Sequence, residues 1–143
     1  NMESIKKAIM NNQIDCITSD HSPHDTDSKR LPFEQASAGV IGFESLLPIT
    51  LKLINDNKLP INRLVELLSF NPSKILNLNS GTLKKKRPAD LVLVDYKKNI
   101  KLSSSLIKSK SNNFPYENLN GRGKIIMTIV DGKIIYNDRS FNI

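Results

Sequence analysis

The strongest constraint on the fold is a change in the spacing of apolar residues near Ser80-Gly81. Before this point, apolar residues recur at helical intervals, most clearly from Val40 to Ile54. After it, they gather in short runs typical of strands, such as Ala89 to Asp95. The pattern therefore predicts an α/β protein with two regions, residues 1–78 and residues 79–143.

The first region opens with a helical pattern and one strand. Residues 1–12 carry apolar side chains at helical spacing and predict a short amphipathic helix. Ile14 to Thr18 then predicts a short buried strand. A polar stretch from Asp20 to Ala38 follows, and loops of this length in compact domains are commonly functional.

Further helices complete the first region. The long apolar segment that begins at Val40 predicts a helix with a kink or break at Pro48. A second helix is expected after Pro60, with Asn62 as its cap. A short third helix is expected over residues 74–78, after an interruption at Asn71-Pro72.

The second region is expected to be β-rich. Strands are predicted at Ala89 to Asp95, Lys124 to Val130 and Lys133 to Tyr136, with a further short strand at Ile100 to Leu102. Asp131-Gly132 separates two of these runs. It predicts a hairpin turn, because glycine readily adopts the positive φ that such turns need.

The charge of the chain limits its partners. The 143 residues carry a net charge of +7, which raises the question of nucleic-acid binding. The lysines are spread along the chain, and the one dense run, Lys84 to Arg87, has no interleaved aromatic residues of the kind a stacking surface requires. This run is interpreted as a solvated turn, and nucleic acid is not expected as a partner.

Cysteine content and hydropathy bear on the compartment. The single cysteine, Cys16, cannot form a disulfide within the chain, which fits a reducing compartment. No apolar run approaches the roughly 18–20 residues that span a bilayer, and no signal peptide with an apolar core is found. The sequence thus predicts a soluble, cytoplasmic protein with no membrane partner.

The candidate chemistry lies in Thr18-Ser19-Asp20-His21-Ser22-Pro23-His24. A carboxylate directly after a strand would face the mouth of a β/α barrel, where active sites are found. Asp20 there could take a proton from a metal-bound water and deliver it to a leaving nitrogen, as hydrolysis of an amide or imide ring requires. Alternatively, Asp20 only caps the loop.

The only two histidines of the chain, His21 and His24, lie within four residues of Asp20. Their spacing is not that of a closed zinc motif. A histidine here either binds a substrate carboxylate or fixes a ligand near a metal, or it is an ordinary loop residue.

A cluster of small residues, Ala36-Ser37-Ala38-Gly39-Val40-Ile41-Gly42, precedes the long helix. Small residues at such a position let backbone amides approach an anionic group near the positive end of a helix. The pattern alone names no ligand, and a glycine needed only for a tight turn explains it at least as well.

Taken in order, these motifs resemble the C-terminal part of a class I dihydroorotase of the amidohydrolase superfamily. The resemblance covers essentially the whole chain with matching gaps. It rests on Thr18–His24, Phe33–Ala36, Gly39–Glu44, Leu64–Leu76, Gly81–Leu83, Ala89–Asp95, Ser109–Ser111 and Thr128–Tyr136.

The resemblance implies a zinc enzyme that interconverts N-carbamoyl-L-aspartate and L-dihydroorotate in pyrimidine biosynthesis. Residues 1–78 would be the C-terminal part of a metal-dependent (β/α)8 barrel. Residues 79–143 would supply strands of a small β-sandwich domain beside it. A metal-bound hydroxide would attack the ring amide carbonyl, which the metal polarises.

The resemblance also implies roles for individual residues. Asp20 matches a ligand of one or two zinc ions that also shuttles the proton. His24 matches the histidine that binds the substrate carboxylate, and Gly39 lies where backbone amides hold the substrate. The family often has Pro-Phe-Gly where this chain has Ser37-Ala38-Gly39, and His21 matches a common family residue with no role carried over.

The chain lacks other residues that the family uses, namely a His-x-His pair on the first barrel strand and further ligand histidines. A complete barrel also takes roughly 250 residues. The chain is therefore expected to be part of a longer protein and to be inactive alone.

Two alternatives stay open at this point. One is another cyclic amidohydrolase, of the allantoinase or dihydropyrimidinase type, against which His24 argues. The other is a non-catalytic dihydroorotase-like partner of aspartate transcarbamoylase. A homodimer and a complex with that transcarbamoylase are the protein assemblies that the resemblance leaves open.

Overall fold

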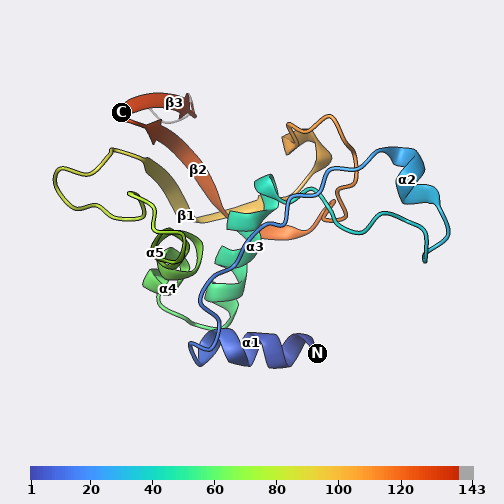
Figure 1. Cartoon of the computed structure of the whole chain (residues 1–143), viewed down its shortest axis with the longest axis horizontal. Coiled ribbons are helices and arrows are strands. Elements are labelled where there is room, and N and C mark those ends of the chain that lie inside the picture. The colour runs from blue at the N-terminus through green and yellow to red at the C-terminus, as the bar shows by residue number, and fades with distance from the viewer. Residues whose placement is uncertain (139–143) are drawn as a thin grey trace.

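The computed structural model describes residues 1–138, so residues 139–143 of the expected second region lie outside the described residues. Helices come first along the chain and strands follow (Figure 1), which confirms the predicted α/β composition. The helical elements are α1 (Met2–Met10), α2 (Thr26–Arg30), α3 (Phe43–Asp56), α4 (Ile61–Val65), the π-helical turn η1 (Glu66–Phe70) and α5 (Asn71–Ile75). The strands are β1 (Leu91–Lys101), β2 (Asn120–Val130) and β3 (Lys133–Asn137), with a 3₁₀ turn, η2 (Ser104–Leu106), after β1.

The three strands form an antiparallel sheet in the order β1-β2-β3. The predicted hairpin is confirmed: Asp131 and Gly132 join β2 to β3 with φ values of 48° and 74°, the positive values that a tight hairpin turn needs. The segments expected as strands at 89–95 and 100–102 are largely one strand, β1. A second sheet is not present within residues 1–138, so the sandwich arrangement stays a prediction.

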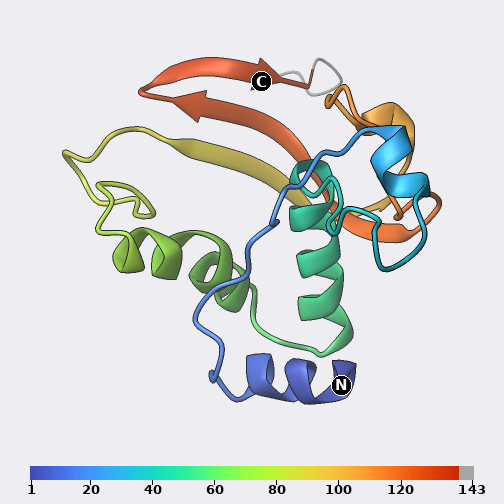
Figure 2. The ribbon, with the colours of Figure 1, turned by 45° about the vertical axis from the view of Figure 1, so that its right-hand side comes forward.

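Helix α3 packs against one face of the sheet and carries much of the core (Figure 2). Leu51 of α3 is buried, and it lies where a side chain at Gly123 of β2 would collide with it. A Cβ at Gly121 would come within 2.8 Å of Pro48 Cβ. Two glycines of β2 thus let the helix approach the strand closely. The buried apolar cluster around Leu51 comprises Ile9, Leu51, Ile54, Leu64 and Leu67.

The helices differ from the sequence predictions at their ends and joints. Helix α3 runs through Pro48 without a break, so a break there is ruled out and a kink stays a prediction. Helices α4, η1 and α5 follow one another without a gap, so the interruption expected at Asn71-Pro72 is also wrong. Pro72 lies in the first turn of α5, and it has no N–H to donate to a carbonyl oxygen of the preceding turn. The cap position of α4 is occupied by Pro60 and not by the predicted Asn62, which lies inside the helix. No side-chain hydrogen bond caps α4.

The segment Ile14–Thr18 forms no β-ladder, so the predicted strand is wrong for this structure. A strand needs a neighbour that offers a row of hydrogen bonds, and within residues 1–138 no strand lies beside this segment. Helical residues hold it instead. Leu67 accepts a hydrogen bond from the Ile17 N–H (3.0 Å), and the buried Arg63 guanidinium donates to the Ile14 carbonyl (2.7 Å).

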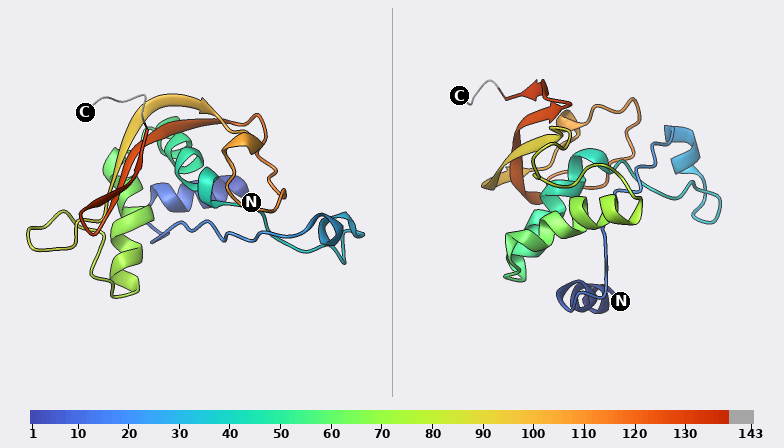
Figure 3. Two further views of the ribbon diagram at one scale, coloured as in Figure 1. Left: turned by 90° about the horizontal axis from the view of Figure 1, so that it is seen from above. Right: turned by 60° about the vertical axis from the view of Figure 1, so that its left-hand side comes forward.

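The helix predicted over residues 1–12 is confirmed as α1, with Ile9 as its buried residue. Cys16 is half-buried. Within residues 1–138, none of the helices combines the length and the hydropathy needed to cross a membrane. Figure 3 shows α2 and its flanking loops projecting away from the α3–sheet core.

Candidate functional site

Asp20 ends the segment that leads from α1 toward the candidate site. Its backbone has a φ of 42°, in the left-handed region that aspartate and asparagine enter more easily than most residues. The Ser22 hydroxyl donates to the Asp20 carbonyl oxygen at 3.0 Å, which fixes the turn. The residue is exposed, so its carboxylate is accessible to a ligand that approaches from outside this chain.

His21 faces the start of α3. Its Nδ1 accepts a hydrogen bond from the Gly42 N–H at 3.2 Å. Its ring stacks on Phe43 with the centroids 3.8 Å apart and the planes 6° from parallel. The structure therefore gives His21 a local structural role at the amino-terminal end of α3.

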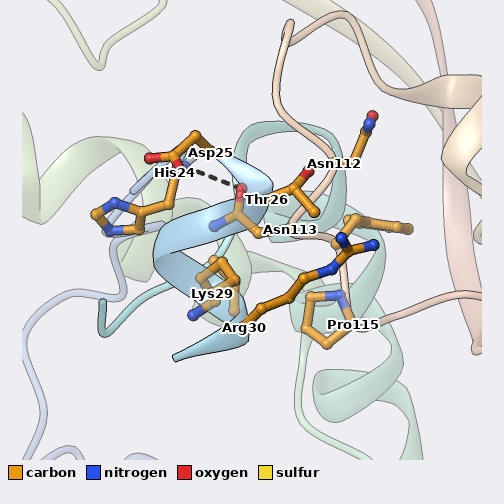
Figure 4. Close-up of a pocket in the computed structure, with 10 residues that line it drawn as sticks. His24, Asp25, Thr26, Lys29, Arg30, Asn112, Asn113 and Pro115 are labelled. Atoms are coloured by element: carbon orange, nitrogen blue, oxygen red, sulfur yellow. Dashed lines mark hydrogen bonds between the residues drawn. The ribbon is translucent and has the colours of Figure 1, made fainter. Parts of the chain in front are cut away.

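His24 lies further along this loop, half-buried in a cleft (Figure 4). Its Nε2 is 2.8 Å from the Ala38 carbonyl oxygen. A carbonyl oxygen only accepts, so Nε2 carries a hydrogen and donates it. The backbone N–H of His24 donates to Asn113 Oδ1 at 3.1 Å. Both the ring and the main chain of His24 are thus held in place.

Gly39 belongs to the second loop of the site. Its φ is 102°, and a Cβ built on it would lie 2.5 Å from Ser22 Cβ. A side chain is therefore excluded here both by backbone conformation and by space. The same Cβ position lies 3.9 Å from His24 Nε2, so the structure brings Gly39 and His24 together.

The cleft beside His24 has a volume of about 410 Å³. Lys29 and Arg30 of α2 line it on one side, and the loop that contains Asn113 lines it on the other. Asp20 is not among the lining residues. The complete lining is His24, Asp25, Thr26, Lys29, Arg30, Val40, Asn112, Asn113, Phe114 and Pro115.

The charges around the cleft are predominantly positive. Asp25 caps α2: the backbone N–H of Ser28 donates to its carboxylate at 2.8 Å, and this bond lowers the pKa of Asp25. The Lys29 ammonium donates to the carbonyl oxygens of Ser37 (2.6 Å) and Gly39 (3.1 Å). With Arg30 also on the wall, the cleft favours an anionic ligand.

Sequence reasoning missed most of the lining of the cleft, including Lys29 and Asn113. Lys29 lies in the loop that was expected to be functional, but no motif marked it. Asn113 belongs to the pair Asn112-Asn113 before Phe114-Pro115, which indicates a turn. Nothing in that pattern reveals that the turn lies against His24, 89 positions earlier in the chain.

The described residues do not form a metal site by themselves. Within residues 1–138, no group of three or more histidine, cysteine, aspartate and glutamate side chains lies close enough together to hold a metal ion. Asp20 offers one accessible carboxylate. A metal bound there would need its other ligands from outside this chain.

Two dihydroorotases are similar to this chain along most of its length. One, from Geobacter sp. (strain M21), is 37% identical over 135 residues, which cover 94% of this chain and 32% of the relative. The other, from Ehrlichia chaffeensis, is 38% identical over 135 residues, which cover 94% of this chain and 29% of the relative. The chain thus spans about a third of the length of these curated relatives.

A solved structure and a family profile give the fold and the family of the chain. The D-hydantoinase of Bacillus sp. AR9 superposes with a TM-score of 0.86 at 22% identity, covering 99% of this chain and 33% of that structure. At this identity the match supports the fold alone. The profile of the Amidohydrolase family matches residues 1–135, and with so much of its length matched, the chain belongs to the amidohydrolase family.

Proposed function

We propose that this chain is the C-terminal part of a dihydroorotase, which interconverts N-carbamoyl-L-aspartate and L-dihydroorotate. The observation that carries the proposal is the similarity to two dihydroorotases, at 37% and 38% identity over 135 residues. Because the chain spans only about a third of those relatives, the activity is assigned to the complete protein and not to residues 1–143 alone.

Asp20 is proposed to move the proton in this reaction. Opening the ring of dihydroorotate requires that water lose a proton and that the departing ring nitrogen gain one. One carboxylate within reach of both atoms can perform both transfers in turn. The exposed position of Asp20 supports this role, since a carboxylate locked in a buried ion pair could not accept the proton.

The cleft beside His24 is proposed to hold the carboxylate of the substrate. Lys29 and Arg30 outnumber Asp25 among the charged residues of its wall, and Gly39 lets its loop approach Ser22 and His24 closely. Because Nε2 of His24 already donates to Ala38, a carboxylate would have to accept from Nδ1. His24 would then carry hydrogens on both ring nitrogens and act as a cation.

Members of the amidohydrolase and dihydroorotase family are generally metal-dependent, and we propose one or two zinc ions for this protein. Asp20 is the ligand that this chain would contribute, and the remaining ligands would come from the rest of the protein. When bound, the metal would polarise the ring carbonyl and lower the pKa of a bound water, so that hydroxide forms near neutral pH.

The proposal extends to the architecture of the complete protein. Residues 1–78 would belong to a β/α barrel, in which Ile14–Thr18 would gain the neighbouring strand that it lacks here. Residues 79–143 would belong to a small β domain next to the barrel. A homodimer and a complex with aspartate transcarbamoylase are the assemblies to test.

The experiment compares the complete protein with residues 1–143. Zinc content is measured by atomic absorption, and turnover is measured with dihydroorotate, hydantoin, dihydrouracil and allantoin. We expect zinc and dihydroorotate turnover in the complete protein, and neither in the fragment. Preference for hydantoin, dihydrouracil or allantoin would replace the proposal with another cyclic amidohydrolase. A complete protein with neither metal nor turnover would support the non-catalytic partner of aspartate transcarbamoylase.

A further inference from the structure

The side-chain amide of Asn113 joins both loops of the cleft. Its Oδ1 accepts from the backbone N–H of His24 at 3.1 Å, and its Nδ2 donates to the Ser22 carbonyl oxygen at 2.8 Å. The same Nδ2 lies 3.4 Å from the Gly39 carbonyl oxygen. One side chain therefore contacts the backbone on both sides of the site.

The main chain of Asn113 strengthens this connection. Its carbonyl oxygen accepts from the Ile41 N–H at 3.1 Å, just beyond Gly39. The residue is half-buried, so water competes less for these hydrogen bonds than it would at an exposed position. Asn113 is distant in sequence from these partners: those of its side chain lie 74 to 91 positions earlier.

The chemistry of the side chain suits this arrangement. Holding an N–H and two carbonyl oxygens requires an acceptor and a donor on one short, planar group, which the asparagine amide provides. Aspartate has the same shape but offers only acceptors when ionised, so it would face the carbonyl oxygens of Ser22 and Gly39 with like charge. Alanine would leave all three backbone groups without this partner.

We propose that Asn113 is a positioning residue, which holds His24 and Gly39 at the spacing that the substrate carboxylate requires. This inference rests on the proposed function, because it assigns the cleft to substrate binding. Asn113 acts through the two loops and is not itself assigned a contact with the reacting atoms. Asn113, which follows β1, would in this way control the affinity of a site whose binding residues, His24 and Gly39, precede β1.

The test uses the complete protein with Asn113→Ala, Asn113→Asp and the control Asn99→Ala. Asn99 is an exposed asparagine of β1, remote in sequence from both loops. We expect KM for dihydroorotate to rise about tenfold in both Asn113 variants while kcat stays within about threefold, because the loss falls on binding geometry. The control variant should keep the parent KM. In a His24→Ala background, Asn113→Asp should raise KM much less, because the group that it positions is gone.

A second readout does not depend on the substrate. Hydrogen exchange measured by mass spectrometry should show faster exchange in peptides covering residues 20–31 and 37–42 of both Asn113 variants, with β2 and the carboxyl-terminal half of α3 unchanged. If the parent protein does not turn over dihydroorotate, the proposed function fails, and this exchange pattern alone decides whether Asn113 orders the two loops. An unchanged KM in an active protein, or exchange that rises equally in β2, would overturn the inference.

Discussion

The α3–β2 core and the cleft around His24 are built by different forces. In the core, a helix lies on a strand through apolar side chains and two glycines, with Leu51 only 2% exposed. In the cleft, backbone groups of two loops are held by the side chains of Lys29 and Asn113. Apolar packing tolerates modest changes in shape, whereas hydrogen bonds require particular partners at particular distances.

Because of this difference, substitutions in the core and substitutions at the site should have different effects. Changes in the core should lower the free energy of unfolding and leave the chemistry of the remaining folded molecules intact. Changes at the site should alter turnover or substrate affinity and leave unfolding nearly unchanged. The predictions below test this separation in the complete protein.

The largest effect is expected for Asp20→Asn. Loss of the carboxylate that is proposed to transfer the proton should lower kcat on dihydroorotate by about 10³-fold, with little change in the midpoint of thermal unfolding. Asparagine is well suited to the left-handed backbone at this position, so the fold should not be strained. The matched control is Asp15→Asn, at another exposed aspartate of the same segment, which should keep full turnover. Substantial residual activity in Asp20→Asn would remove Asp20 from the role of proton shuttle.

The next effect belongs to the core. Leu51→Ala should lower the free energy of unfolding by about 3 kcal/mol, because it removes buried methyl groups and leaves a cavity beneath β2. Leu83→Ala, at a leucine that is 87% exposed, should change it by less than about 0.5 kcal/mol. Urea denaturation measures both. If Leu51→Ala instead raised KM strongly without a loss of stability, the separation between core and site would not hold.

The same contrast explains which features could be predicted from the sequence. The Asp131-Gly132 hairpin and most of α3 follow from local patterns, since a turn glycine and helical spacing act over a few residues. The strand at Ile14–Thr18 could not be decided locally, because a strand exists only when a neighbour completes its hydrogen bonds. The π-helical turn η1 likewise has no marker in the apolar spacing.

At the site, the resemblance selected His24 and Gly39, and the structure brings these two together. It could not reveal why they meet, because the contacts run from a loop after β1 back across more than 70 positions to main-chain atoms. Backbone groups are present at every residue, so no residue type marks such partners. Their substrate-binding roles stay predictions, as does the role of Asp20.

The two histidines offer a finer comparison within a few residues. His24→Ala should raise KM for dihydroorotate about tenfold, because the proposed hydrogen-bond donor to the substrate carboxylate is lost. His21→Ala should instead lower the free energy of unfolding by about 1 kcal/mol, through the lost stacking on Phe43 and the lost acceptor for the Gly42 N–H. Steady-state kinetics and urea denaturation of both variants separate these outcomes. An unchanged KM in His24→Ala would count against its role in binding.

The smallest effect concerns Asp25, which caps α2 on the wall of the cleft. Because the Ser28 N–H holds the pKa of Asp25 below its usual value, the cap is complete above the pKa of the unfolded chain and is lost as the pH falls through the lower, folded value. Protection of the α2 amides, corrected for intrinsic exchange, should therefore drop in acid in the parent protein. Asp25→Ala should show low protection at every pH, whereas Asp27→Ala, which keeps the cap, should retain the pH dependence. Equal pH profiles for Asp25→Ala and the parent would mean that α2 is ordered by its contacts with the cleft and not by its cap.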